Sequence, residues 1–115
     1  MKIIDAHLHL FPENEPQFEE MAQSVGHHNS AAHLRQAYRD LGIVHGVVMG
    51  NRSLRAADHD YPADLFHYCV GLDSALFRQG GSTTAHLAER IEENLASPAC
   101  CGVKLYPGYN KTWLW

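Results

Sequence analysis

The chain opens with the stretch Lys2-Ile3-Ile4-Asp5-Ala6-His7-Leu8-His9-Leu10. The pattern of apolar and polar residues in this stretch is the main indication of the fold. Ile3 and Ile4 are apolar and β-branched, and Phe11-Pro12 interrupts the pattern soon afterwards. Such a short apolar run bounded by a turn signal is typical of a buried strand. We therefore predict a first strand over residues 2–8.

Polar side chains alternate with apolar ones at the end of this strand. Because successive side chains of a strand point to opposite faces, Asp5, His7 and His9 are expected to share one face. Residues two apart along a strand are separated by roughly 6.5 to 7 Å, a span that two imidazoles close by converging on one divalent ion. In parallel α/β proteins, active sites collect at this carboxyl end of the strands. The opening stretch therefore predicts a metal site with His7 and His9 as two of its ligands.

Downstream of the first strand, helical and strand patterns alternate. The acidic loop 12–29 is expected to hold a short helix that starts at Pro16. A longer helix is predicted from a Ser30 cap to Gly42, with its apolar stripe at Leu34, Ala37, Tyr38 and Leu41, and another carries Leu87, Ile91 and Leu95 before Pro98. Further strands are predicted over Ile43–Met49, Phe66–Leu72 and Cys101–Tyr106. Strands that alternate with amphipathic helices indicate an α/β fold with parallel pairing, either a small doubly wound sheet or part of a barrel.

Two motifs resemble the amidohydrolase superfamily, and in particular amidohydrolase family 2. They are Ile4-Asp5-Ala6-His7-Leu8-His9-Leu10 and Gly102-Val103-Lys104-Leu105-Tyr106-Pro107. The resemblance implies a (β/α)8 TIM barrel in which these motifs form strands one and four. It also implies a catalytic divalent metal, commonly zinc, held by His7 and His9. The activity implied is hydrolysis of an amide, lactone or ester of a small-molecule substrate, or a decarboxylation.

Lys104 is the second candidate site residue, a catalytic one. Strand parity places it opposite Val103 and Leu105, so it points into the barrel if those two side chains pack on the outer helices. A lysine held there needs a partner, because an unpaired buried ammonium is costly. Three roles stay open: a carbamate that bridges two metals, as in some members of the superfamily, a charge contact to a substrate carboxylate or within the structure, and a solvent-facing side chain.

Length sets a limit on this resemblance. A (β/α)8 barrel takes about 250 residues, whereas the 115 residues of this chain offer four strand candidates. We therefore expect residues 1–115 to form the N-terminal half of a barrel domain, strands one to four of eight, with a tail at 111–115 that departs from the family pattern. By the resemblance, further ligands and the general base come from later strands. We accordingly expect little or no turnover by this chain alone, and self-association through its exposed sheet edges.

Composition excludes several classes of partner. The formal charge is −4 and the basic residues are scattered, so nucleic acid is not an electrostatically favoured partner. No apolar run is long enough to span a bilayer, and the N-terminus lacks the features of a secretory signal, so we expect no membrane and a cytoplasmic location. The three cysteines, Cys69, Cys100 and Cys101, are expected to be reduced, buried thiols on strands.

The remaining histidines, drawn from a total of nine, are assigned structural or surface roles. His27 and His28 are expected at the surface, where they can overhang the site, and His45 and His67 are expected to be hydrogen-bonded within strands. The cluster Asp58-His59-Asp60 is expected in a solvated loop. His33 and His86 lie on helices among polar neighbours.

Two other classes of function stay open from the sequence. Metal-dependent nucleases of the TatD type and phosphoesterases of the PHP type also begin with a strand that carries two histidines separated by one residue. A small α/β domain can also bind a metal without turning over a substrate. Substrate preference distinguishes the nucleases and phosphoesterases from an amidohydrolase. A stable monomer with a closed core would favour the metal-binding domain without turnover.

Overall fold

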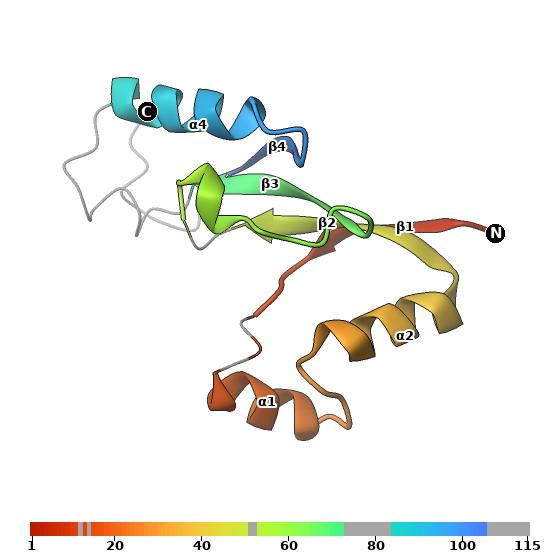
Figure 1. Cartoon of the computed structure of the whole chain (residues 1–115). Helices are drawn as coiled ribbons and strands as arrows, with labels where there is room; N and C mark the ends of the chain where they lie inside the picture. The colour runs from red at the N-terminus through yellow and green to blue at the C-terminus, as the bar shows by residue number, and fades with distance from the viewer. Residues whose placement is uncertain (12, 14, 51–52, 73–83, 106–115) are drawn as a thin grey trace.

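The computed structural model of the protein describes residues 1–11, 13, 15–50, 53–72 and 84–105. Within these ranges the elements follow in the order β1 (Ile3–Leu8), α1 (Pro16–Gln23), α2 (Ala31–Leu41), β2 (Ile43–Gly50), the 3-10 helix η1 (Ala56–Asp58), β3 (Phe66–Leu72), α4 (Thr84–Leu95) and β4 (Cys100–Leu105). Figure 1 shows α1 lying beside α2 and, apart from them, α4 lying over the sheet near β4. The α/β class predicted from the sequence is confirmed.

The four strands form one parallel sheet in the order β1-β2-β3-β4. The predicted bounds of β3 are reproduced, β2 continues to Gly50, and β4 begins at Cys100. The predicted end of the last strand at Tyr106 and the atypical tail at 111–115 lie outside the described residues. Parallel neighbours in sequential order require each connection to return to the same end of the sheet, which is the role of the intervening helices and loops.

The core lies on one side of the sheet. It is built from Val48, Phe66, Tyr68 and Val70 of the strands with Tyr38 of α2. Tyr38 packs edge-on against Phe66, with ring centroids 6.1 Å apart, and Asn94 of α4 accepts a hydrogen bond from the Tyr68 hydroxyl. Phe66 and Tyr68 are two residues apart on β3 and therefore share a face. Both α2 and α4 thus cover the same side of the sheet.

The ends of α2 form as the sequence predicts. The Ser30 hydroxyl accepts a hydrogen bond from the backbone N–H of His33 at 3.2 Å, which caps the first turn. Gly42 ends the helix with a φ of 72°, a left-handed conformation that glycine adopts without steric cost. The short helix predicted from Pro16 is present as α1. No helix in the described part of the chain combines the length and the apolar character needed to cross a membrane.

Gly46 on β2 allows α2 to approach the sheet closely. A Cβ atom at this position would lie 2.8 Å from the Tyr38 hydroxyl oxygen and 2.9 Å from the Phe66 ring. Both distances are shorter than van der Waals contact, so any side chain here would displace one of two buried aromatic rings. The absence of a side chain at Gly46 therefore makes room for the Tyr38 ring of α2 against the strands.

Candidate functional site

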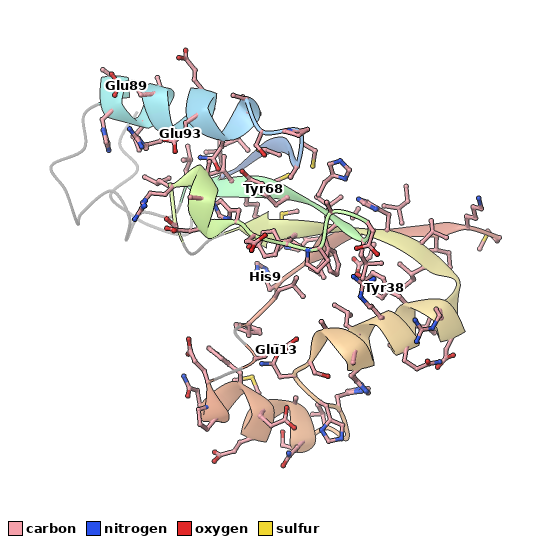
Figure 2. The ribbon with its side chains drawn as sticks, viewed as in Figure 1. His9, Glu13, Tyr38, Tyr68, Glu89 and Glu93 are labelled. Carbon is pink, nitrogen blue, oxygen red and sulfur yellow. The ribbon has the colours of Figure 1, made fainter. Side chains whose placement is uncertain are left out.

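The imidazoles of His7 and His9 lie next to each other at the carboxyl end of β1. Their ring centroids are 5.3 Å apart and their planes are inclined by 69°. Two imidazoles bound to one zinc ion at about 2.1 Å, at a near-tetrahedral angle, have centroids roughly 5 Å apart. Figure 2 shows His9 just beyond the strand, near the loop that carries Glu13. The spacing of the two rings therefore fits a pair of ligands on one ion.

A β-bulge lies in the same stretch. Asp5 pairs with Gly46 and Leu8 with Val48, so three steps along β1 match two steps along β2. Such a bulge interrupts the alternation of side chains between the two faces. The expectation that strict alternation carries Asp5, His7 and His9 to one face therefore does not hold across this strand.

Asp5 is bound to the helix layer. One oxygen of its carboxylate accepts a hydrogen bond from the Tyr38 hydroxyl at 3.0 Å, and the other accepts from the backbone N–H of His7 at 3.2 Å. Burial, together with this carboxylate, raises the pKa of Tyr38 above its usual value of 10.0. Asp5 thus faces α2 and supports the part of β1 on which His7 lies, and the expectation that it joins the polar face of the two histidines is corrected.

The described residues do not form a complete set of metal ligands. Among the residues of 1–11, 13, 15–50, 53–72 and 84–105, no group of three or more His, Cys, Asp or Glu side chains is arranged to hold a metal ion. A structural or catalytic zinc site takes three or four ligands from the protein, so the pair of His7 and His9 would need at least one more ligand to form such a site.

Lys104 lies near the carboxyl end of β4, the same end of the parallel sheet as His7 and His9. It pairs with Gly71, whereas its neighbours Val103 and Leu105 pair with the buried residues Val70 and Leu72. Lys104 is half-buried, and its positive charge acts on the thiol of Cys69. Lys104 therefore lies on the opposite face of β4 from Val103 and Leu105. These two side chains are exposed, so the helix packing on which the predicted inward orientation of Lys104 depends is not observed for them.

His45 and His67 form a pair between β2 and β3. The Nε2 atom of His45 lies 2.6 Å from Nδ1 of His67, and their ring centroids are 4.8 Å apart. One ring therefore donates a proton to the other. The prediction of hydrogen-bonded histidines within strands is confirmed for both residues.

A pocket of about 560 Å³ opens beside His9, between the α1–α2 segment and the loop that precedes β3. Its walls include Leu10, Leu34 and Phe66, and its lining also includes His27, His28 and His33. His27 and His28 are exposed, as predicted, and each has a partner: His27 Nδ1 lies 3.1 Å from His33 Nε2, and His28 Nδ1 lies 2.8 Å from Glu19 Oε1. These histidines therefore border the pocket that His9 also lines.

Glu19 holds the α1–α2 connection together. Its carboxylate accepts hydrogen bonds from the ring of His28 and from the backbone N–H of Asn29. The hydrogen bond with His28, the larger cause, and that with Asn29 lower the pKa of Glu19 to about 2. The acidic run that the sequence indicates thus supplies at least one specific tether, besides its solvated carboxylates.

The expectation that Asp58-His59-Asp60 lies in a solvated loop is wrong for its central residue. His59 is 5% exposed and stacks on Tyr68, with ring centroids 4.4 Å apart and planes inclined by 23°. Its Nε2 atom lies 3.0 Å from the carbonyl oxygen of Ser53. Burial lowers the pKa of His59 below its usual 6.5. Only Asp58 and Asp60 of this cluster are exposed.

Asn94 is fully buried, and no pattern in the sequence predicts this. Its side chain accepts from the Tyr68 hydroxyl at 2.9 Å and donates to the carbonyl oxygens of Leu54 and Arg90, both at 2.8 Å. An asparagine on a helix face is usually solvated, so only the proximity of the Leu54 loop could have revealed this role.

The cysteines divide between two environments. Cys69 and Cys100 are half-buried on β3 and β4, whereas Cys101 is exposed. The expectation of three buried thiols is therefore wrong for Cys101. The Sγ atoms of Cys69 and Cys101 lie 3.9 Å apart.

Comparison with protein-family models, curated proteins and solved structures gives no match for this chain. The resemblance to the amidohydrolases accordingly depends on the motifs of β1 and β4 alone.

Proposed function

We propose that this chain carries the opening half of the metal centre of an amidohydrolase-type hydrolase, with His7 and His9 as ligands of a divalent metal, zinc in the first instance. The observation that carries the proposal is the 5.3 Å separation of their ring centroids at the carboxyl end of β1. That separation is about the one that two imidazoles adopt on a single zinc ion.

The arrangement of the sheet supports the N-terminal half of a (β/α)8 barrel. In a barrel, consecutive strands are neighbours and all helices lie outside, whereas a doubly wound sheet reverses its strand order and carries helices on both faces. The order β1-β2-β3-β4 and the position of α2 and α4 on one side follow the first pattern. His45, His67 and Cys69 would then line the barrel interior.

The chemistry follows from the two motifs. When bound, a divalent metal lowers the pKa of a water molecule toward about 7 and polarises a carbonyl group, which serves hydrolysis of an amide, lactone or ester. His7 and His9 would hold the ion, and the hydrogen bond from the His7 backbone to Asp5 would keep this end of β1 in place. Lys104, at the same end of the sheet, would attract an anionic group of the substrate.

Metal binding tests the proposal without requiring turnover. Titration of the metal-free chain with Zn²⁺, followed calorimetrically and by histidine ring NMR signals, should show one site and perturb His7 and His9. His7→Ala and His9→Ala should each weaken zinc binding by about tenfold or more, because each removes one of two ligands. His86→Ala, an exposed histidine on α4, is the matched control and should bind zinc like the wild type. Unchanged affinity in both site variants would overturn the proposal.

Substrate assays of the zinc-loaded chain separate the alternatives. Any turnover should fall on amide, lactone or ester substrates and should disappear in His7→Ala. Turnover of phosphodiesters alone would instead assign the shared histidine pattern to the nuclease or phosphoesterase class. Zinc binding that leaves every one of these substrates untouched, even when the later strands of a barrel are supplied, would favour a metal-binding domain without catalysis.

A further inference from the structure

Two thiols face each other across β3 and β4, away from the candidate metal ligands. The Sγ atoms of Cys69 and Cys101 are separated by 3.9 Å. A disulfide bond is about 2.05 Å long and joins residues whose Cα atoms are about 4.4 to 6.8 Å apart, a range that includes neighbouring strands at about 4.8 Å. The sulfur atoms would therefore need to approach by only about 2 Å.

The β-bulge between β3 and β4 creates this contact. Tyr68 pairs with Cys100 and Cys69 pairs with Gly102, so Cys101 is the extra residue between two ladder partners. The thiol of Cys101 donates to the carbonyl oxygen of Tyr68 at 3.5 Å, which holds it against β3. Because Gly102 has no side chain, the Cys69 sulfur can occupy the space beside it, 3.2 Å from where a Cβ would lie. The two sulfur atoms are thus held side by side by the backbone.

Cys100 belongs to a different environment. Its side chain packs against the core cluster of Tyr38, Val48, Phe66, Tyr68 and Val70, and its thiol donates to the carbonyl oxygen of Gly102. It therefore offers a matched control of the same residue type, adjacent in sequence to Cys101.

We propose that Cys69 and Cys101 form a redox-active dithiol, which a peroxide oxidises to an intramolecular disulfide between β3 and β4. The proposal is independent of the metal centre proposed above, since neither cysteine is among its ligands.

The two thiols differ in the order in which they react. Cys101 is exposed and meets the oxidant first, whereas Cys69 is half-buried. Burial, with the neighbouring Cys101 as a smaller cause, raises the pKa of Cys69 to about 11. A thiol is a weaker nucleophile than its thiolate, so Cys69 is expected to take the second step.

The reaction balances in two steps. The Cys101 thiolate attacks one oxygen of hydrogen peroxide, the O–O bond breaks, and hydroxide leaves, giving a sulfenic acid at Cys101. Cys69 then attacks that sulfur atom through its own, the S–O bond breaks, and the departing hydroxide takes up the proton of the Cys69 thiol as water. In sum, two thiols and one hydrogen peroxide give one disulfide and two waters, with both electrons supplied by the sulfur atoms.

Peptide mapping of the full chain tests the proposal directly. The reduced protein is treated with hydrogen peroxide at low protein concentration, alkylated and digested with trypsin, which places Cys69 in peptide 56–78 and both Cys100 and Cys101 in peptide 91–104. The expected product is a cross-link between these peptides, with fragmentation assigning it to Cys101 and with the alkylating agent found on Cys100. A cross-link through Cys100, a Cys100–Cys101 bridge, links between chains only, or a Cys69 that stays alkylated would each overturn the proposal.

Variants provide a second measurement. Cys100→Ser should form the bridge at the rate of the wild type within roughly twofold, and Cys69→Ser and Cys101→Ser should not form it. In Cys69→Ser, Cys101 should proceed to sulfinic acid, since no resolving thiol remains. Equal bridge formation in Cys101→Ser and Cys100→Ser would contradict the assignment. Because the wild-type peptide map requires no substitution, the test does not depend on whether the variants fold.

Discussion

The hydroxyl of Tyr38 on α2 donates a hydrogen bond to the carboxylate of Asp5 on β1, 3.0 Å away. The two residues are 33 positions apart, and the same carboxylate accepts from the backbone N–H of His7. The second helix is thereby connected to the strand that carries the candidate metal ligands. The position of His7 consequently depends, through Asp5, on a buried tyrosine of another element.

Removal of the Tyr38 hydroxyl tests this connection. Tyr38→Phe should lower the free energy of unfolding by about 1 to 2 kcal/mol, since a hydrogen bond to a carboxylate is lost at a buried site. Urea denaturation followed by circular dichroism measures this change. Tyr61→Phe removes a half-buried hydroxyl whose partner is a histidine ring at 3.5 Å, not a carboxylate, and should cost less stability than Tyr38→Phe. An equal loss of stability in both variants would argue against a specific role of the Tyr38–Asp5 hydrogen bond.

Asp5 should support the metal site without binding the metal. Asp5→Asn keeps one oxygen that can accept from the His7 backbone and places an amide NH2, which can only donate, beside the Tyr38 hydroxyl. The affinity for Zn²⁺ should nevertheless stay within roughly twofold of the wild type, because no ligand is removed. Calorimetric titration beside His7→Ala measures the difference. A loss of zinc affinity in Asp5→Asn as large as that in His7→Ala would place Asp5 in the ligand set.

Burial of His59 should make stability depend on pH. Its folded-state pKa lies below the usual 6.5, because burial disfavours the charged ring. The unfolded chain therefore binds a proton at this residue before the folded chain does, and the stabilisation present above 6.5 is lost as the pH falls through the folded-state pKa.

Denaturation curves recorded from pH 8 to pH 5 measure this dependence. His59→Phe keeps an aromatic ring against Tyr68 but does not titrate, so its stability should fall less steeply with decreasing pH than that of the wild type. His86→Phe, at an exposed position, should keep the slope of the wild type. Identical slopes in all three proteins would exclude His59 as the source.

The contributions of Asn94 and Tyr68 to stability should depend on each other, because their side chains are hydrogen-bonded. Asn94→Ala should cost about 2 to 3 kcal/mol of unfolding free energy, since it leaves the Tyr68 hydroxyl and the Leu54 carbonyl group without their partner in a buried environment. Tyr68→Phe should cost about 1 kcal/mol.

A double-mutant cycle gives the coupling between them. The double variant should be less destabilised than the sum of the single variants by about 0.5 kcal/mol or more, because the second substitution removes a group that the first has already left unpaired. Strict additivity would show that the hydrogen bond between Asn94 and Tyr68 contributes nothing to stability.

Local patterns predict much of this fold. The apolar runs of β2 and β3, the Ser30 cap and the Gly42 stop are properties of neighbouring residues, and the structure reproduces them. The position of His59 is not a local property, because its burial results from stacking on a tyrosine nine residues later in another element. The sequence shows a polar loop there, and only the packed sheet shows which member of that loop is covered.

In the candidate site, too, features that depend on neighbouring residues are predicted from the sequence, and features that depend on pairing between strands are not. The pattern of His7 and His9 predicts two neighbouring imidazoles, and their rings lie next to each other. The bulges at Asp5–Leu8 and at Tyr68–Cys69 depend on how each strand pairs with its neighbour, and a pattern within one strand carries no information about them. Both the correction for Asp5 and the contact of Cys69 with Cys101 come from these bulges.

The absence of a side chain at Gly46 of β2 also affects the neighbouring strand β1, through Tyr38 and Asp5. A methyl group there would push the Tyr38 oxygen away from Asp5, and the carboxylate would lose the partner that holds it beside the His7 backbone. Evolution of the proposed metal centre is thus constrained at a position that contributes no atom to it. A homologous chain with a larger residue here would have to reseat its second helix before it could present the same two imidazoles.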